Sequence, residues 1–299
     1  MQVLGARAAL AALVLGSGLA AGVDGAGAGP QMPVPVPVRA EAAIADPAVA
    51  ALAEALRIAE LMRILAAEGR AYGGDLQREL FPDGGGPRWD AAVARIHDPA
   101  AMEAAFLSHL ADGFAARPGM AEAARAFFAA DPGARLVGLE LAAREALLDK
   151  DAKEAAELAH EDMKAADDPR LALIARFVAA NDLIESNVVG GLNSNLAFYR
   201  GMIDGGIDDP ALDEGAMMAD LWGQEDQVRA DTEAWLYPYL ALAYAPASDA
   251  DLEAYIAFSL LPEGRALNTV LFAAFDALFV RLSYDLGLAA AMFLQGQDL

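Results

Sequence analysis

Polar residues that could form a site lie along a helix predicted over 169–203. At 100° per residue Asn195 falls in the middle of the apolar face, and Asn181 and Glu185 flank that face one turn apart. A buried amide without a hydrogen-bond partner costs about 1–3 kcal/mol. Asn195 therefore forms either a structural bond between helices, which we favour, or part of a polar pocket. The enzymatic alternative uses Glu185 as acid/base, with Asn181 or Arg200 orienting a substrate.

Aromatic residues gather around Trp222 and Trp235, and Pro238 is expected to break the helix that carries them. The pattern favours core packing with a kink. The alternative is an exposed aromatic groove that binds a peptide or a small ligand. Asn181, Glu185, Asn195, Arg200, Trp222 and Trp235 are thus the candidate binding residues.

Other patterns do not predict catalysis, a metal or a cofactor. His97, His109 and His160 fall on three predicted helices without zinc-site spacing. Glu157 and His160 have the Glu-x-x-His spacing of di-metal bundles, but such a site needs a second copy, which the sequence lacks. The chain has no cysteine, which excludes thiolate chemistry and disulfides. We predict no catalytic residues, no metal site and no cofactor.

The composition indicates a folded, acidic protein. Of 299 residues 56% are hydrophobic, and 44 acidic residues against 21 basic ones give a formal net charge of -23. Such a field repels nucleic acid and anionic lipid headgroups. We therefore expect no nucleic-acid partner and no stable membrane insertion of the mature chain.

The N-terminus is typical of an exported protein. Residues 1–28 read as a signal peptide with an apolar run after Arg7, and residues 29–46 form a linker in which proline and valine alternate. The apolar run is too short to span a bilayer convincingly. We expect a cleaved signal and a periplasmic location; an uncleaved anchor is the alternative.

The remaining pattern predicts an all-α, multi-helix bundle. Asp-Pro pairs begin several helical stretches, since Asp caps the free amides and Pro suits the first helical position. Ser248 and Asp251 form a further capping box. The predicted helices are 47–69, 71–80, 87–97, 99–116, 119–130, 132–166, 169–203, 214–245 with a break near Pro238, and 249–295 with a break near Pro262.

An internal repeat divides this bundle into two similar halves in tandem, 47–166 and 169–295. Phe127 matches Phe258, Gly133 matches Gly264 and Leu136 matches Leu267, each pair with the same separation in the sequence. Whether the halves form one bundle or two domains is left open by the sequence.

The second half also carries a family-like motif. The run 255–259, an aromatic-rich helix end, followed by the break and helix start at 262–267, resembles the motif of the bacterial family known as domain of unknown function 2059. Leu261 stands where that family often has Ser. The resemblance implies an exported, helical, periplasmic protein, and it supplies no catalytic residues.

Together these patterns favour a periplasmic binding or protein-interaction module whose partner is a protein or a small ligand. The alternatives are an enzyme with its acid/base at Glu185, and a structural envelope protein held by an uncleaved signal. A homo-oligomer is left open.

Overall fold

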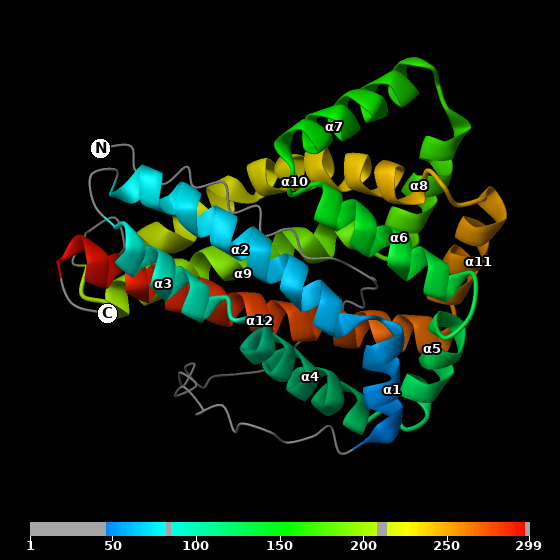
Figure 1. The fold of residues 1–299 in the computed structure, drawn as a ribbon, viewed down its shortest axis with the longest axis horizontal. Coiled ribbons are helices and arrows are strands. Elements are labelled where there is room, and N and C mark those ends of the chain that lie inside the picture. Colours follow the sequence, from blue (N-terminus) through cyan, green and yellow to red (C-terminus); the bar gives the residue numbers. More distant parts are fainter. Residues whose placement is uncertain (1–45, 82–84, 208–213, 297–299) are drawn as a thin grey trace.

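The computed structural model describes residues 46–81, 85–207 and 214–296. Every regular element in these ranges is an α-helix, and none of the described residues forms a strand, so the predicted all-α class is confirmed. The predicted signal peptide and all but the last residue of the linker lie outside the described residues. The helices are α1 (Pro47–Ala55), α2 (Ile58–Leu80), α3 (Pro87–Ile96), α4 (Pro99–Ala115), α5 (Met120–Phe128), α6 (Gly133–Ala146), α7 (Lys150–Ala165), α8 (Pro169–Ala180), α9 (Leu183–Asp204), α10 (Glu214–Tyr244), α11 (Asp249–Ser259) and α12 (Pro262–Leu294) (Figure 1).

The predicted helix starts are largely confirmed. The side chains of Asp46, Asp98 and Asp168 each accept a hydrogen bond from a backbone amide of the first turn. Ser248 and Asp251 form the reciprocal capping box at the start of α11. Asp131 is an exception, because Pro132 occupies the N-cap position of α6 without a side-chain hydrogen bond.

Five predicted boundaries were wrong. Helix α2 is continuous from Ile58 to Leu80, although a boundary between residues 69 and 71 was predicted. Arg57 and Asp182 adopt left-handed φ values of 54° and 49°. They separate α1 from α2 and α8 from α9, where longer helices were predicted. Asp149 caps a new helix, α7, inside the predicted stretch 132–166. Pro238 lies within α10, which continues past it instead of breaking. Non-glycine residues with positive φ cost free energy, which packing elsewhere must offset.

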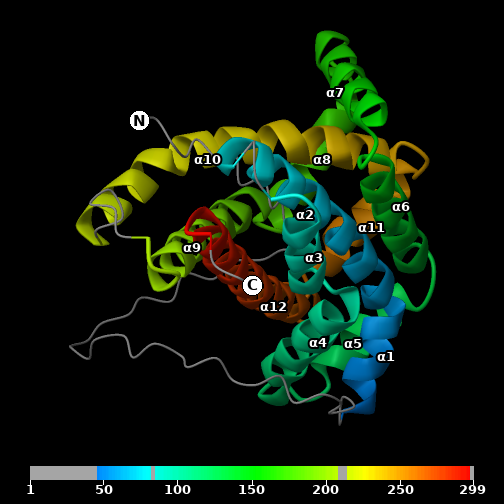
Figure 2. The ribbon, with the colours of Figure 1, turned by 60° about the vertical axis from the view of Figure 1, so that its left-hand side comes forward.

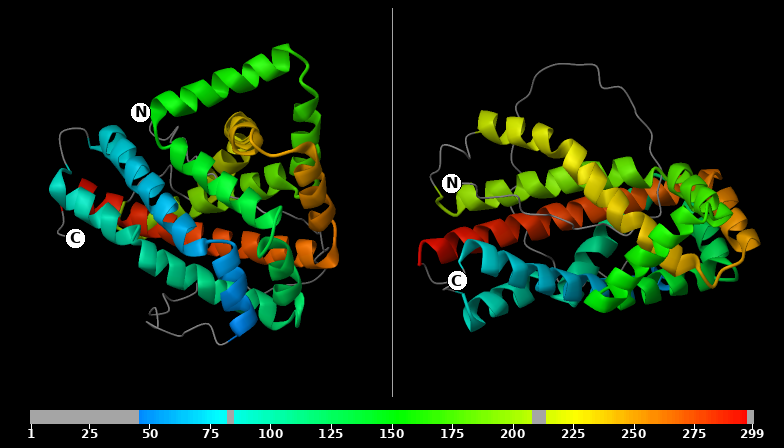
Figure 3. Two further views of the ribbon diagram at one scale, coloured as in Figure 1. Left: turned by 45° about the vertical axis from the view of Figure 1, so that its right-hand side comes forward. Right: turned by 90° about the horizontal axis from the view of Figure 1, so that it is seen from above.

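Helix α12 lies at the centre of the bundle and packs along α9 (Figure 3). The two helices run parallel and approach closely through glycines. A Cβ atom on Gly201 would lie 2.1 Å from the Tyr284 carbonyl oxygen, and one on Gly287 would lie 2.1 Å from the Phe198 carbonyl oxygen. By length and composition α12 could also cross a membrane, but 50% of its most apolar window is buried inside the bundle. This is the pattern of a central core helix.

A shared core joins the two parts of the chain. Phe106 of α4 packs against Phe275 of α12 with ring centroids 4.6 Å apart. Phe127 of α5 stacks on Phe258 of α11 at 4.3 Å, with the ring planes inclined by 8°. Because one hydrophobic cluster includes residues from α1 to α12, residues 47–166 and 169–295 belong to one bundle.

Helix α7 projects from this bundle as an arm that crosses α10 at a large angle (Figures 1 and 2). Ala156 is its one buried residue, and Leu158 is 61% exposed. The His160 ring stacks parallel to the Tyr237 ring of α10, with centroids 6.1 Å apart. All the lysines of the chain, Lys150, Lys153 and Lys164, lie on this helix, and the other basic residues are arginines.

Candidate functional site

Asn181 makes a structural contact at the junction of α8 and α9. Its side chain is fully buried, and its Nδ2 donates to the Phe177 carbonyl oxygen at 2.9 Å. Its Oδ1 accepts a 3.0 Å hydrogen bond from Nδ2 of Asn268 on α12. Both sides of the amide are thereby satisfied inside the core, so Asn181 fixes the broken helix to α12.

Glu185 forms an ion pair at the surface. The Arg229 guanidinium of α10 contacts both of its carboxylate oxygens, with Nη2 2.9 Å from Oε2. These hydrogen bonds hold the pKa of Glu185 below its usual value. A general acid or base works best with a pKa near the working pH. The environment of Glu185 moves its pKa further below neutral pH, which does not suit a general acid or base.

Asn195 and Arg200 are separate from this ion pair. Asn195 is half-buried, and its Nδ2 donates to Gln224 Oε1 of α10 at 3.2 Å, which makes it a bond between helices. Arg200 is exposed. The candidates on α8 and α9 therefore contact α12, α10 and solvent at different points, and the described structure does not bring them together around one cavity.

Of the two candidate tryptophans, Trp235 contacts the edge of a polar cluster in the core. Its half-buried ring stacks on Tyr239 with centroids 4.9 Å apart, and the Arg144 guanidinium carbon lies 5.3 Å from its centroid. This geometry fits a cation–π contact. Trp222 lies in α10, but its side chain is outside the described residues.

The centre of this cluster is Glu140 on α6, which is 5% exposed. Its Oε1 accepts a 2.6 Å hydrogen bond from the Tyr244 hydroxyl, and its carbonyl oxygen accepts one of 3.2 Å from Tyr239. The hydroxyl of Tyr255 on α11 is also fully buried and faces the carboxyl, without a short hydrogen bond to a described residue. Three tyrosines thus surround one acid.

Arg144 extends the cluster one turn along α6. Its side chain is 2% exposed, and its Nε and Nη2 atoms each lie 2.7 Å from a different carboxylate oxygen of Glu68 on α2. This two-point geometry is the strongest that an arginine and a carboxylate can form. We refer to Glu140, Arg144, Glu68, Tyr239, Tyr244 and Tyr255 as the Glu140 cluster.

Burial raises the pKa of Glu140 to about 7, although the hydroxyls of Tyr244 and Tyr255 partly oppose the shift. Burial also raises the pKa values of Tyr239, Tyr244 and Tyr255 well above 10, so the tyrosines remain neutral. The carboxyl of Glu140 can therefore gain or lose a proton near neutral pH. Such shifted acids are common at functional sites.

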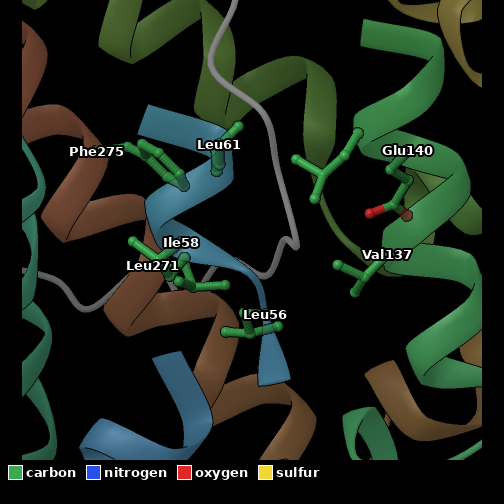
Figure 4. A pocket seen from close by; sticks show the side chains of 8 residues that line it. Leu56, Ile58, Leu61, Val137, Glu140, Leu271 and Phe275 are labelled. Carbon is green, nitrogen blue, oxygen red and sulfur yellow. The ribbon is translucent and has the colours of Figure 1, made fainter. Parts of the chain in front are cut away.

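A small cavity lies beside Glu140, between α1, α2, α6 and α12 (Figure 4). Its volume is about 20 Å³, and on the same scale one water molecule needs roughly 10–15 Å³. The cavity is too small for an organic ligand. Its lining consists of Leu56, Ile58, Leu61, Val137, Glu140, Leu141, Leu271 and Phe275.

The sequence pattern did not predict the Glu140 cluster. Glu140 follows Leu136 by four residues and precedes Arg144 by four, so an acid and a base lie on the same helical face as a buried leucine. That spacing was the available signal. Its tyrosine partners are about a hundred residues away in the sequence, which a helical pattern does not predict.

Within the described ranges no group of His, Asp or Glu side chains lies in an arrangement that could hold a metal ion. Comparison with known proteins found no match: no family model, no curated protein and no solved structure is similar to this chain.

Proposed function

We propose that this chain is an exported helical protein that works as a protein-interaction module, with α7 as the element its partner contacts. The observation that carries the proposal is the exposure of α7. This helix buries one residue, while Leu158 and the preceding Leu148 are 61% and 41% exposed. An exposed helix that presents an apolar side chain such as Leu158 is one of the elements by which proteins bind partners.

The stability of α7 needs an explanation that core packing does not provide. Most helices in proteins are held by burying an apolar face. Helix α7 instead relies on its Asp149 cap and on ion pairs along its surface, such as Lys164 with Glu161 at 2.9 Å. Such pairs contribute roughly 0.2–0.5 kcal/mol each. A helix kept in this way contributes little to the core, which supports a role outside it.

The alternatives have weaker support. The acid/base proposed for an enzyme, Glu185, is an exposed ion-paired carboxylate with a lowered pKa. The cavity beside Glu140 is too small for an organic ligand. A structural envelope protein held by an uncleaved signal would differ at the N-terminus of the exported chain. N-terminal sequencing after periplasmic extraction separates these cases, because a start near Gly29 excludes the anchor.

We also propose that the bundle consists of two similar halves, as the repeat predicts. A Cβ atom on Gly133 would lie 2.3 Å from the carbonyl oxygen of Phe127, and one on Gly264 would lie 2.2 Å from that of Phe258. The matched glycines thus make the same contact, six residues after matched aromatics. Left-handed Arg57 and Asp182 likewise occupy equivalent junctions, α1–α2 and α8–α9.

Helix packing supports the same correspondence. Helix α1 packs on α5 as α8 packs on α11, and α2 packs on α4 as α9 packs on α10. Between the halves, α4 packs on α12 and α10 packs on α6. Helix α3 has no counterpart in this scheme, and α7 connects the halves. Membership of the domain of unknown function 2059 family remains a proposal that rests on the sequence motif alone.

Photo-cross-linking in the native host tests the interaction proposal. A photoreactive amino acid replaces Leu158 on α7, and in a matched control it replaces Val189 on α9, which is 56% exposed. We expect a discrete adduct from position 158 in the periplasmic fraction and none from position 189. No adduct from position 158, or the same adducts from both positions, would overturn the proposal.

A further inference from the structure

The carboxyl of Glu140 lies where α6 meets the second half of the chain. Tyr244 ties it to α10, Tyr255 faces it from α11, and the adjoining cavity separates it from α1, α2 and α12. The carboxyl is thus hydrogen-bonded to one neighbouring helix, faces a second, and is separated from the others by the cavity. A change in the charge of this group acts on all of these contacts together.

The polar groups around the carboxyl come from only some of these elements. Helix α10 contributes Tyr244 and α11 contributes Tyr255, while Tyr239 of α10 donates to the backbone carbonyl oxygen of Glu140. Arg144, four residues along α6, is held by Glu68 of α2. The cavity walls from α1, α2 and α12 are apolar, formed by Leu56, Ile58, Leu61, Leu271 and Phe275. A neutral carboxyl suits this environment, because an isolated carboxylate beside apolar walls loses its hydration.

We propose that the Glu140 cluster is a proton-controlled latch, in which loss of the Glu140 proton attracts the Arg144 guanidinium away from Glu68 and releases α2 from α6. This latch is separate from the interaction proposed for α7. Arg144 is the cation one helical turn along the same face, and side chains four residues apart on a helix are neighbours. Tyr255 provides an additional hydroxyl donor for the carboxylate.

Exposure favours movement of Arg144 over movement of the acid. The Glu68 side chain is 30% exposed, whereas that of Arg144 is 2% exposed. Glu68 can therefore become hydrated when its partner leaves, while Glu140 cannot reach solvent without opening the core. The raised pKa of Glu140, about 7, places the change near neutral pH.

Trp235 provides a local signal for the latch, since the Arg144 guanidinium carbon lies 5.3 Å from its ring centroid. The experiment is a titration of tryptophan fluorescence with pH on the full chain, with a Trp235→Phe variant subtracted to isolate this residue. We expect a one-proton transition with a midpoint near pH 7. Glu140→Gln should abolish it, and Glu68→Gln should move the midpoint to lower pH because Arg144 is then free to pair with Glu140.

Two controls separate the latch from other titrating groups. His160 stacks on Tyr237, two residues from Trp235, and burial lowers its pKa. His160→Gln should leave the midpoint unchanged, as should Glu161→Gln on the exposed face of α7. A transition that persists in Glu140→Gln, or that disappears in His160→Gln, would overturn the proposal.

A second measurement needs no variant. Hydrogen exchange of the wild-type chain is compared on the two sides of pH 7, after correction for the intrinsic pH dependence of exchange. We expect protection to fall in α2 around Glu68 at the higher pH, while protection in the α9–α12 pair stays constant. Equal protection of α2 at both pH values contradicts the latch even if Glu140→Gln fails to fold.

Discussion

Replacing Glu140 by Gln should change how the free energy of unfolding depends on pH. Burial raises the pKa of Glu140 from 4.5 to about 7 in the folded chain. The folded chain therefore holds more protons than the unfolded chain between these values, and stability falls as pH rises through this window. At 1.36 kcal/mol per unit, the wild type loses about 3 kcal/mol to this group and does not regain it above about pH 7.

Glutamine is the matched substitution because it stays neutral and its side-chain oxygen can still accept from Tyr244. Other titrating groups are the same in both proteins, so their contributions cancel in the difference. We expect Glu140→Gln to gain about 3 kcal/mol relative to wild type between about pH 4.5 and pH 8.

Urea unfolding followed by helical circular dichroism, repeated across this range, measures the difference. Tyr244→Phe serves as a control for the hydrogen bond, since it removes the 2.6 Å contact and leaves the acid in place. A difference between Glu140→Gln and wild type that stays constant with pH would refute the reasoning. It would mean that the acid does not change its protonation in this window, and the latch would lose its basis.

Three further substitutions and one control test the packing of α9 against α10 and α12, each by urea unfolding. Gly201→Ala should cost about 1–3 kcal/mol because its Cβ would lie 2.1 Å from an α12 carbonyl oxygen, whereas Gly223→Ala, which has open space, should be neutral or stabilising by up to about 1 kcal/mol; equal effects would contradict the close approach. Asn268→Leu should cost about 1–3 kcal/mol by leaving the Asn181 oxygen without its donor, and an unchanged midpoint would contradict that bond. Asn195→Leu should change stability by less than about 1.5 kcal/mol, since it loses a single half-buried bond; a larger loss would show a more central role.

The sequence predicted the helical class and most helix starts because these depend on nearby residues. An Asp side chain caps amides two or three residues ahead, so Asp46 and Asp98 could be interpreted without tertiary information. The break at Asp182 depends instead on distant contacts. Asn181, the residue before it, bonds to Asn268 on α12, 87 residues away. The helical pattern within 169–203 cannot predict that contact, because Asn268 lies outside this range.

For the candidate site too, features that depend on nearby residues were predicted, and features that depend on distant contacts were not. Asn195 was correctly predicted as a polar residue that contacts another helix, although it is half-buried rather than central to a buried face. Glu140 was overlooked, since an acid within an Ala- and Leu-rich helix usually faces solvent. Its burial depends on the packing of α10 and α11 against α6. Tyr244 of α10, which bonds to Glu140, is 104 residues away from it in the sequence.

Because all of its lysines lie on α7, the chain can be cleaved selectively within this helix. A protease that cleaves only after lysine can cut this sequence at Lys150, Lys153 and Lys164 and nowhere else. Each cut falls on α7, at the end of the first proposed half, away from the stacked rings of Phe127 and Phe258. Digestion therefore yields two large fragments with an intact interface between them. The two fragments form a two-piece complex, in which reassembly of the halves can be measured without any substitution.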